Sequence, residues 1–167
     1  MKTPRAWTLP ADVDTDQLAP GQTMKHGLDV TAAHCLSAVR PDFAGGVRRG
    51  DFVVAGPRFG IGSSREQAAS VLVHLGVAAV VAPSFNGLYL RNAFNVGLLL
   101  VTCARAGEIE DGEAIRVDAR AGTLWRADGT ALPCTPIPAF LLDMVEAGGL
   151  LPQLKKRQAM RTNEPTP

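Results

Sequence analysis

The sequence predicts an α/β fold. Three short apolar segments, residues 51–56, 77–84 and 98–103, alternate with two segments of helical character. Buried strands that alternate with helices are typical of parallel sheets joined by right-handed crossovers. After Gly107 the pattern changes to short alternating segments cut by Ala-Gly and Asp-Gly turns. This later pattern indicates antiparallel hairpins.

Length and composition limit the classes of protein to which the chain can belong. Its 167 residues suit one domain with a substantial core. Hydrophobic residues make up 46% and charged residues 20%, as in ordinary soluble domains. A net charge of +1 argues against a general nucleic-acid binder, which carries a basic excess. The apolar runs are too short to span a bilayer, and we expect no signal peptide at the N-terminus.

The cysteines argue against a metal or cluster site made by this chain alone. There are three, Cys35, Cys103 and Cys134, far apart and without a C-x-x-C pair. We expect these thiols to be small core residues of a cytoplasmic protein, because the cytoplasm keeps thiols reduced.

The elements before the first apolar segment are weakly marked. Residues 1–22 are rich in Asp, Thr and Pro, which predicts a strand or loop with turns that end at Pro20-Gly21. Residues 30–39 have weak helical periodicity, and Pro41 ends that helix. Residues 51–56 are then a buried strand bounded by polar residues and glycines.

The central elements are the clearest. Residues 63–75 predict a helix with an apolar face, and Gly76 is placed to end it. A buried strand follows over residues 77–84, then a short helix or turn over residues 86–97, then the strand at residues 98–103.

The last third combines hairpins with one helix. Residues 113–134 predict antiparallel hairpins, and an amphipathic helix begins at residue 138 and ends near Gly148 and Gly149. We expect one folded domain over residues 1–152 and a polar, disordered tail over residues 153–167.

The stretch FGIGSSREQ, residues 59–67, has two interpretations. The simpler is structural. Ser63 and Glu66 have the S-x-x-E spacing of a capping box, in which Ser63 is the N-cap of the helix. Gly60 and Gly62 would allow the tight turn from strand to helix.

The second interpretation is an anion site. A glycine-rich turn at a helix N-terminus offers free N–H groups and the positive end of the helix dipole. Arg65 is mildly unfavourable there unless it meets an anion, and its planar fork fits a carboxylate. A nearby serine could move a proton if its alkoxide were stabilised. The stretch lacks both the Walker A pattern and the third glycine of a dinucleotide fingerprint.

Three motifs together resemble a known family. GPRFGIGSSREQA, GVAAVVAPSFNGLYLRNAFNVGLLL and the upstream DVDTDQLAPG are similar to the small subunits of 3-isopropylmalate dehydratase, and they span residues 12–100. Those subunits match the swivelling fourth domain of aconitases. The resemblance implies a three-layer β/β/α swivelling domain with a mixed sheet.

The resemblance also implies an activity. Members of this family are hydro-lyases that isomerise 2-isopropylmalate and 3-isopropylmalate by dehydration and rehydration, in leucine biosynthesis. A large subunit holds a [4Fe-4S] cluster whose open iron acts as a Lewis acid on the substrate. This chain would then bind no cofactor itself, and it would be active only in a heterodimer or heterotetramer with that large subunit.

Residue roles follow from the same motifs. Ser63 would be the catalytic base, as an alkoxide that takes the carbon-bound proton. Ser64 would support substrate or oxyanion binding, and Arg65 would clamp a substrate carboxylate. Asp16 would lie at the rim of the site and orient a catalytic group of the partner. The alternative for Asp14 and Asp16 is a turn or helix-cap role.

The loop after the first motif leaves the substrate open. Met24 would accept an isopropyl group, whereas Lys25 would accept a second carboxylate or lie solvated at the surface. Methylmalate (citramalate), dimethylmalate and homoaconitate are therefore alternative substrates. A different class, a non-catalytic anion-binding or regulatory module, is also open. We expect structural roles for Arg91 and Asn92, and the role of His26 is open.

Overall fold

The computed structural model describes residues 3–162 and confirms the α/β class. A parallel sheet contains β1 (Ala6–Leu9), β2 (Phe52–Ala55), β3 (Ala79–Ala82) and β4 (Leu99–Thr102). Its strands lie side by side in chain order, and every neighbouring pair is parallel. The three strands predicted from apolar segments are β2, β3 and β4.

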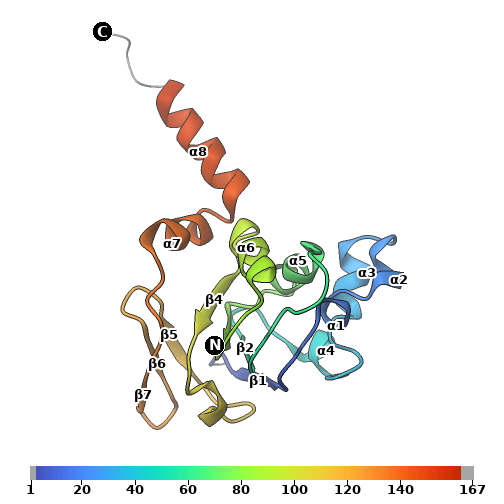
Figure 1. Ribbon diagram of the computed structural model, residues 1–167, viewed down its shortest axis with the longest axis vertical. Helices are drawn as coiled ribbons and strands as arrows, with labels where there is room; N and C mark the ends of the chain where they lie inside the picture. The colour runs from blue at the N-terminus through green and yellow to red at the C-terminus, as the bar shows by residue number, and fades with distance from the viewer. Residues whose placement is uncertain (1–2, 163–167) are drawn as a thin grey trace.

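The order of the strands explains where the helices lie. When parallel strands follow one another in chain order, right-handed crossovers place all the connecting helices on one face of the sheet. Figure 1 shows the helices between strands on that face. They are α1 (Thr15–Leu18), α2 (Gly21–Met24), α3 (Leu28–Ala33), α4 (Phe43–Gly46), α5 (Gln67–His74) and α6 (Gly87–Asn95).

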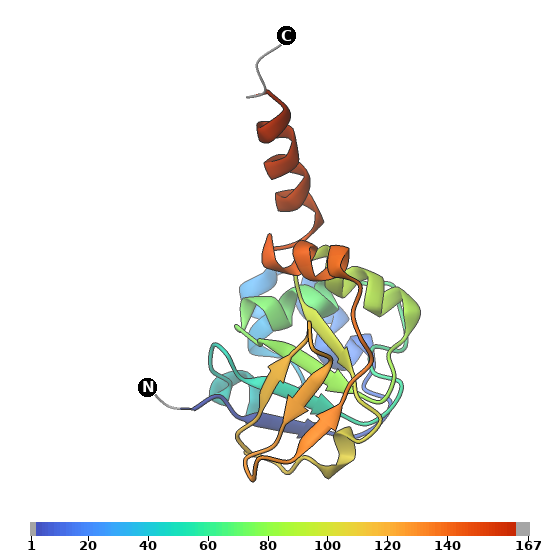
Figure 2. The ribbon, with the colours of Figure 1, turned by 90° about the vertical axis from the view of Figure 1, so that its left-hand side faces the viewer.

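A second sheet covers the opposite face. After the 3₁₀ helix η1 (Ala106–Glu108), strands β5 (Arg116–Asp118), β6 (Thr123–Trp125) and β7 (Ala131–Pro133) form the predicted antiparallel hairpins. Figures 1 and 2 show the resulting β/β/α layers.

One detail of the expected fold differs. The parallel and antiparallel strands form two sheets and not one mixed sheet. A single antiparallel bridge, Arg5 to Ala114, joins the edge of β1 to the segment before β5. After this bridge the chain turns away from β1 and crosses the face of the parallel sheet, because the apolar residues of β5–β7 are buried against that face.

The alternation of side chains along the parallel strands creates two cores. One set points toward the helices: Trp7, Leu9, Val53, Ala55, Val80, Ala82 and Leu100. The other set meets Leu124 and Leu132 of the second sheet: Ala6, Val54, Ala79, Val81 and Val101. The parallel sheet is therefore buried on both faces, which explains why its strands are apolar almost throughout.

Two predicted helices have different limits. The helix expected at residues 30–39 covers Leu28–Ala33 and is followed by turns. Leu36 adopts a positive φ of 61°, and its N–H donates to the Gln17 carbonyl at 2.8 Å, so the chain cannot continue as a helix there. The helix expected from residue 63 begins at Gln67.

The expectation of a disordered tail is corrected for residues 153–162. The chain forms α7 (Ala139–Glu146), turns at Gly148 and Gly149, and continues as α8 (Leu150–Thr162). Both glycines have positive φ, which breaks the helix between the two segments. Leu, Gln, Lys, Arg, Ala and Met, which dominate α8, are strong helix formers. The remaining residues of the expected tail, 163–167, lie outside those that the structure describes.

Within residues 3–162, no helix combines the length and the apolar character needed to cross a bilayer.

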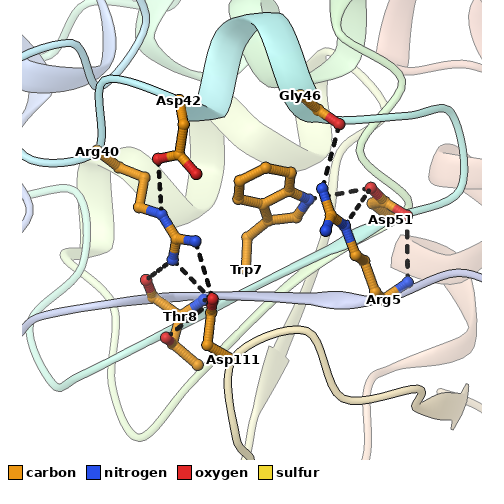
Figure 3. A network of polar contacts seen from close by, with 8 residues as sticks. All are labelled: Arg5, Trp7, Thr8, Arg40, Asp42, Gly46, Asp51 and Asp111. Atoms are coloured by element: carbon orange, nitrogen blue, oxygen red, sulfur yellow. Dashed lines mark hydrogen bonds and ion pairs between the residues drawn. The ribbon is translucent and has the colours of Figure 1, made fainter.

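A buried carboxylate anchors the edge strand β1. Asp51 is 3% exposed and accepts hydrogen bonds from Trp7 Nε1 at 3.0 Å and from the backbone N–H groups of Arg5 (3.1 Å) and Arg48 (3.0 Å). The guanidinium groups of Arg5 and Arg40 lie over the Trp7 ring, 4.2 and 4.9 Å from its centroid (Figure 3). Asp51 thereby fixes β1 to the loop before β2.

Arg40 fixes the same strand from its other side. Its guanidinium donates to both Asp111 oxygens, at 2.7 and 2.8 Å, and to the Thr8 carbonyl at 3.1 Å (Figure 3). This pairing holds the pKa of the Asp111 carboxyl well below its usual range. The edge of β1 is therefore covered by polar contacts, which protects it from pairing with another chain.

We predict that Asp51→Ala lowers the free energy of unfolding by about 3 kcal/mol, because it leaves three donors without their acceptor. Asp42→Ala is the matched control. Asp42 belongs to the same network but is exposed, and within residues 3–162 its side chain pairs with Arg40 alone, so we expect no measurable change. Denaturant unfolding measures both variants. Equal stabilities of the two variants would contradict an anchoring role for Asp51.

Candidate active site

The two sequence motifs lie side by side at one edge of the parallel sheet. Each follows the carboxyl end of a strand, the first after β1 and the second after β2. Backbone hydrogen bonds join them, from Gly60 N to the Val13 carbonyl at 2.8 Å and from Thr15 N to the Ile61 carbonyl at 2.9 Å. Crevices outside the carboxyl ends of parallel strands are common ligand sites in α/β proteins.

Two glycines allow this close approach. At Gly60, with φ of 82°, an added Cβ atom would lie 2.2 Å from Cγ of the buried Tyr89 ring. At Gly62, with φ of 104°, it would lie 2.9 Å from Thr15 Oγ1. Both positions therefore require glycine for their backbone conformation and for space.

The Ser63–Ser64 segment is held extended by two distant side chains. Thr15, which is 1% exposed, accepts a hydrogen bond from Ser63 N at 3.0 Å, and its Oγ1 lies 3.2 Å from Ser63 Oγ. The buried Asn92 of α6 donates to the Ser64 carbonyl at 2.8 Å. These contacts leave the two serine side chains exposed at the surface.

The capping interpretation of Ser63 is wrong. Helix α5 begins at Gln67, and Glu66 precedes it in a helical conformation without a side-chain cap. A capping box does occur in the other motif. Gln17 N donates to Asp14 Oδ1 at 2.8 Å, and Asp14 N donates to Gln17 Oε1 at 3.0 Å. The cap role considered for Asp14 is therefore confirmed.

The start of α5 carries unused donors. Within residues 3–162, no hydrogen bond is donated by the backbone N–H groups of Ser64, Arg65, Glu66 and Gln67. Free N–H groups at a helix N-terminus, together with the helix dipole, favour a negative charge. The extended segment thus presents hydroxyl and N–H groups at the same edge.

Arg65 is one of these four residues, and its side chain forms an ion pair with Asp16. Its Nη1 donates to Asp16 Oδ1, while Nε and Nη2 have no acceptor in the described part of the chain. Gly21, the first residue of α2, lies beside the guanidinium, since an added Cβ there would be 3.8 Å from Nη1 and Nη2. The structure therefore brings together Ser63, Ser64, Arg65 and Asp16 of the predicted site.

Met24 and Lys25 follow Gly21 by about one helical turn. Met24 is half-buried and packs against the main core, whereas Lys25 is exposed. Between residues 3 and 162, no hydrogen bond or ion pair joins either side chain to Ser63 or Arg65. The pair therefore belongs to the segment that begins at Gly21, beside the Arg65 guanidinium, and makes no polar contact with Ser63 or Arg65 in the described chain.

Sequence reasoning missed two residues that hold the site. The sequence predicts no role for Thr15, which lies between Asp14 and Asp16, and only a structural role for Asn92. Their partners, Ser63 and Ser64, are 48 and 28 residues away, so no local pattern indicates the contacts. Arg91, for which a structural role is expected, is exposed and has no ion-pair partner within the described range.

The cysteines do not form a metal site. No group of three potential ligands among His, Cys, Asp and Glu occurs within residues 3–162. Cys35 lies in the helix-side core and Cys103 in the core between the sheets, as expected for packing residues. Burial raises the pKa of the Cys35 thiol, which disfavours the thiolate that a metal needs.

Comparisons with known proteins give a consistent result. Residues 42–106 match the family described as the aconitase C-terminal domain. The chain is 40% identical to the 3-isopropylmalate dehydratase small subunit 1 of Archaeoglobus fulgidus over 149 residues, which cover 88% of this chain and 92% of that protein. It is 39% identical to the methanogen homoaconitase small subunit of Methanothermobacter thermautotrophicus, over 88% of this chain and 86% of that one.

A solved structure is similar over nearly the whole length. The crystal structure of a 3-isopropylmalate dehydratase from Methanocaldococcus jannaschii superposes with a TM-score of 0.89 at 34% sequence identity. The superposition covers 96% of each chain. Similarity of this extent includes the antiparallel sheet and most of the C-terminal helices as well as the three motifs.

We predict that Thr15→Val loosens the serine segment, because the hydroxyl oxygen that accepts from Ser63 N is lost. The free energy of unfolding should fall by about 1 kcal/mol. Amide hydrogen exchange at Ser63 should become faster, and Thr15→Ser should restore protection. Thr31→Val is the matched control, since Thr31 is equally buried but bonds the Gly27 carbonyl. Unchanged exchange at Ser63 in Thr15→Val would contradict this role.

Proposed function

The chain belongs to the family of 3-isopropylmalate dehydratase small subunits, hydro-lyases of the aconitase superfamily, and from this premise we propose that Ser63, Ser64, Arg65 and Asp16 form its half of the active site. One observation carries the proposal. The Ser63–Ser64 segment is held extended beside Arg65, with exposed hydroxyls and a run of unused N–H donors. The reaction would isomerise 2-isopropylmalate and 3-isopropylmalate.

The large subunit is the partner implied by a two-subunit dehydratase. The residues of this chain do not fit an iron–sulfur cluster, because its described cysteines lie in separate places and two are buried in different cores. We therefore assign the [4Fe-4S] cluster to the large subunit, in a heterodimer or heterotetramer. Free cysteines also suit a cytoplasmic location, where thiols stay reduced.

Ser63 is the proposed base. A serine alkoxide needs donors that stabilise its charge, and Thr15 Oγ1 lies 3.2 Å from Ser63 Oγ. The unused N–H groups at the start of α5 and the helix dipole add favourable potential. Because Ser63 is exposed in the isolated chain, closure against the large subunit would exclude water and strengthen these interactions. The alkoxide then takes the carbon-bound proton of the substrate.

Arg65 is the proposed carboxylate clamp. Asp16 occupies only Nη1, so Nε and Nη2 form an open edge that fits a carboxylate in two parallel hydrogen bonds. Asp16 would act as a positioning residue that fixes the plane of the guanidinium. Ser64 would support the bound substrate or oxyanion from the neighbouring position.

The loop after Gly21 is the proposed specificity segment. Half-buried Met24 favours an isopropyl group, and exposed Lys25 favours a second carboxylate. The similarity to a homoaconitase small subunit keeps that longer, more acidic substrate as an alternative, with citramalate and dimethylmalate. A non-catalytic anion-binding module with the same fold is the alternative from another class.

The experiment that tests the function is anaerobic reconstitution with the large subunit encoded beside this chain. Formation of the unsaturated acid is followed by ultraviolet absorbance, with isopropylmalate, citramalate, dimethylmalate and homocitrate-type acids in parallel. We expect turnover that requires both chains and is fastest with isopropylmalate. Absence of turnover on every acid, with the cluster intact, would contradict the enzyme and favour the binding module.

We predict that Ser63→Ala lowers turnover of the reconstituted enzyme by about 10³-fold, since the base is removed. Stability should change by less than about 1 kcal/mol, because Ser63 does not cap α5 and its hydroxyl is exposed. Ser70→Ala is the matched control, a serine inside α5 that bonds the Glu66 carbonyl. Equal turnover of the two variants would exclude Ser63 as the base.

We predict that Arg65→Lys raises KM by about tenfold or more, because lysine cannot make the two parallel hydrogen bonds of the fork. Arg58→Lys is the control in the same loop, where the arginine pairs bidentately with Asp12 at 2.6 Å. It should leave KM unchanged. An unchanged KM in Arg65→Lys would count against the clamp.

A further inference from the structure

The last helix, α8, packs on the rest of the molecule only near its start, as far as residues 3–162 show. Figures 1 and 2 show α8 extending away from the body of the molecule. Its first turn is anchored, with Gln153 buried, but Leu151 is 69% exposed and Leu154 48%. Met160 of α8 is 59% exposed, and Phe140 of α7 is 60% exposed. These four are the most exposed large apolar side chains within residues 3–162, and all belong to α7 and α8.

A helix that extends away from the body in this way gains stability from a second surface. Helices of α8's length are marginal in water when they stand alone. Leu151, Leu154 and Arg161 share one face, because they are spaced by three and seven residues. A hollow on that face is lined by Leu154, Arg157, Gln158 and Arg161. The exposed face is therefore apolar at its base and basic toward its end.

The charges of α7 and α8 are complementary. Helix α8 carries four basic residues and no acidic one, whereas α7 carries the exposed acids Asp143 and Glu146 and no base. Arg120 pairs with both acids, which leaves a net negative charge. Within the chain as described, no ion pair joins α7 to α8. Asp143 and Glu146 line one hollow with Lys156 and Arg157, so the opposite charges of the two helices face the same space without an ion pair between them in the described chain.

The position of α8 argues against the active-site partner as its occupant. Helix α6 begins at Gly87, after the carboxyl end of β3, and runs back to the opposite edge of the sheet. Gly149 packs there against the Asn95 carbonyl, where an added Cβ would lie 2.4 Å from its oxygen. Helix α8 therefore starts at the edge opposite Ser63. A large subunit that closes over Ser63 would approach from the other end of the molecule.

We propose that α8 docks on α7 of a second copy of this chain, in a two-fold symmetric dimer of small subunits. The same contact then occurs twice, because a two-fold interface pairs each patch with its counterpart. Leu151 and Leu154 are covered, and Arg157 and Arg161 meet Asp143 and Glu146 of the other copy. This dimer is independent of the proposed catalytic roles and leaves both Ser63 edges open.

Sedimentation equilibrium of the full chain alone tests the dimer first. We expect twice the chain mass of 17.6 kDa at micromolar concentration. Leu154→Asp should give the single-chain mass with an unchanged melting temperature of the domain. Leu88→Asp is the matched control, since Leu88 is exposed to a similar extent, 45%, but lies on α6 at the Ser63 edge. It should remain dimeric.

A charge exchange tests the pairing itself. One variant combines Asp143→Lys with Glu146→Lys, and the other combines Arg157→Glu with Arg161→Glu. Each alone should be monomeric because like charges meet, and an equal mixture should form the dimer because both contacts are then complementary. A mixture that stays monomeric, or a monomeric wild-type chain, would overturn the proposal. A monomeric chain whose Leu154→Asp variant binds the large subunit more weakly would assign α8 to that subunit instead.

Discussion

The proposed site depends on the contact between two loops that are far apart in the chain. The buried hydroxyl of Thr15 receives the backbone of Ser63, and Gly60 and Gly62 allow the loops to approach without side-chain clashes. Without these contacts the segment before α5 would be free to coil as its sequence suggests, and Ser63 would be an ordinary helix cap. The contact thus converts a segment with helical potential into an extended one that presents hydroxyl and N–H groups.

The layers of the fold leave the carboxyl ends of the parallel strands available for binding. Because the parallel strands follow one another in chain order, all their helices cover one face and the antiparallel sheet covers the other. Both faces are then used for packing, and the loops at the carboxyl ends of β1 and β2 are left for binding. In the proposed function, this subunit supplies a base and an anion clamp from the carboxyl ends of its strands, while the large subunit holds the iron–sulfur cluster.

The features of the fold that depend on local sequence pattern were predicted from the sequence. The apolar runs of β2, β3 and β4 and the Gly-punctuated hairpins were predicted at the correct positions. The assignment of Ser63, Arg65 and Asp16 to one site came from the family resemblance and not from local pattern. The predicted start of α5 at Ser63 was wrong. Hydrogen bonds from two residues distant in sequence, Thr15 and Asn92, hold the Ser63–Ser64 segment extended and so prevent it from forming helix. The separation into two sheets and the helical state of residues 153–162 likewise depend on packing and backbone turns, which a polar composition does not reveal.

The most direct test of the proposed role of Ser63 is a crystal structure of the reconstituted enzyme with substrate bound. The measured quantity is the distance between Ser63 Oγ and the substrate carbon that loses its proton. If Ser63 is the base, that distance is about 3–3.5 Å, with Arg65 on a substrate carboxylate. A different side chain within that distance of the carbon, with Ser63 turned away from it, would contradict the assignment.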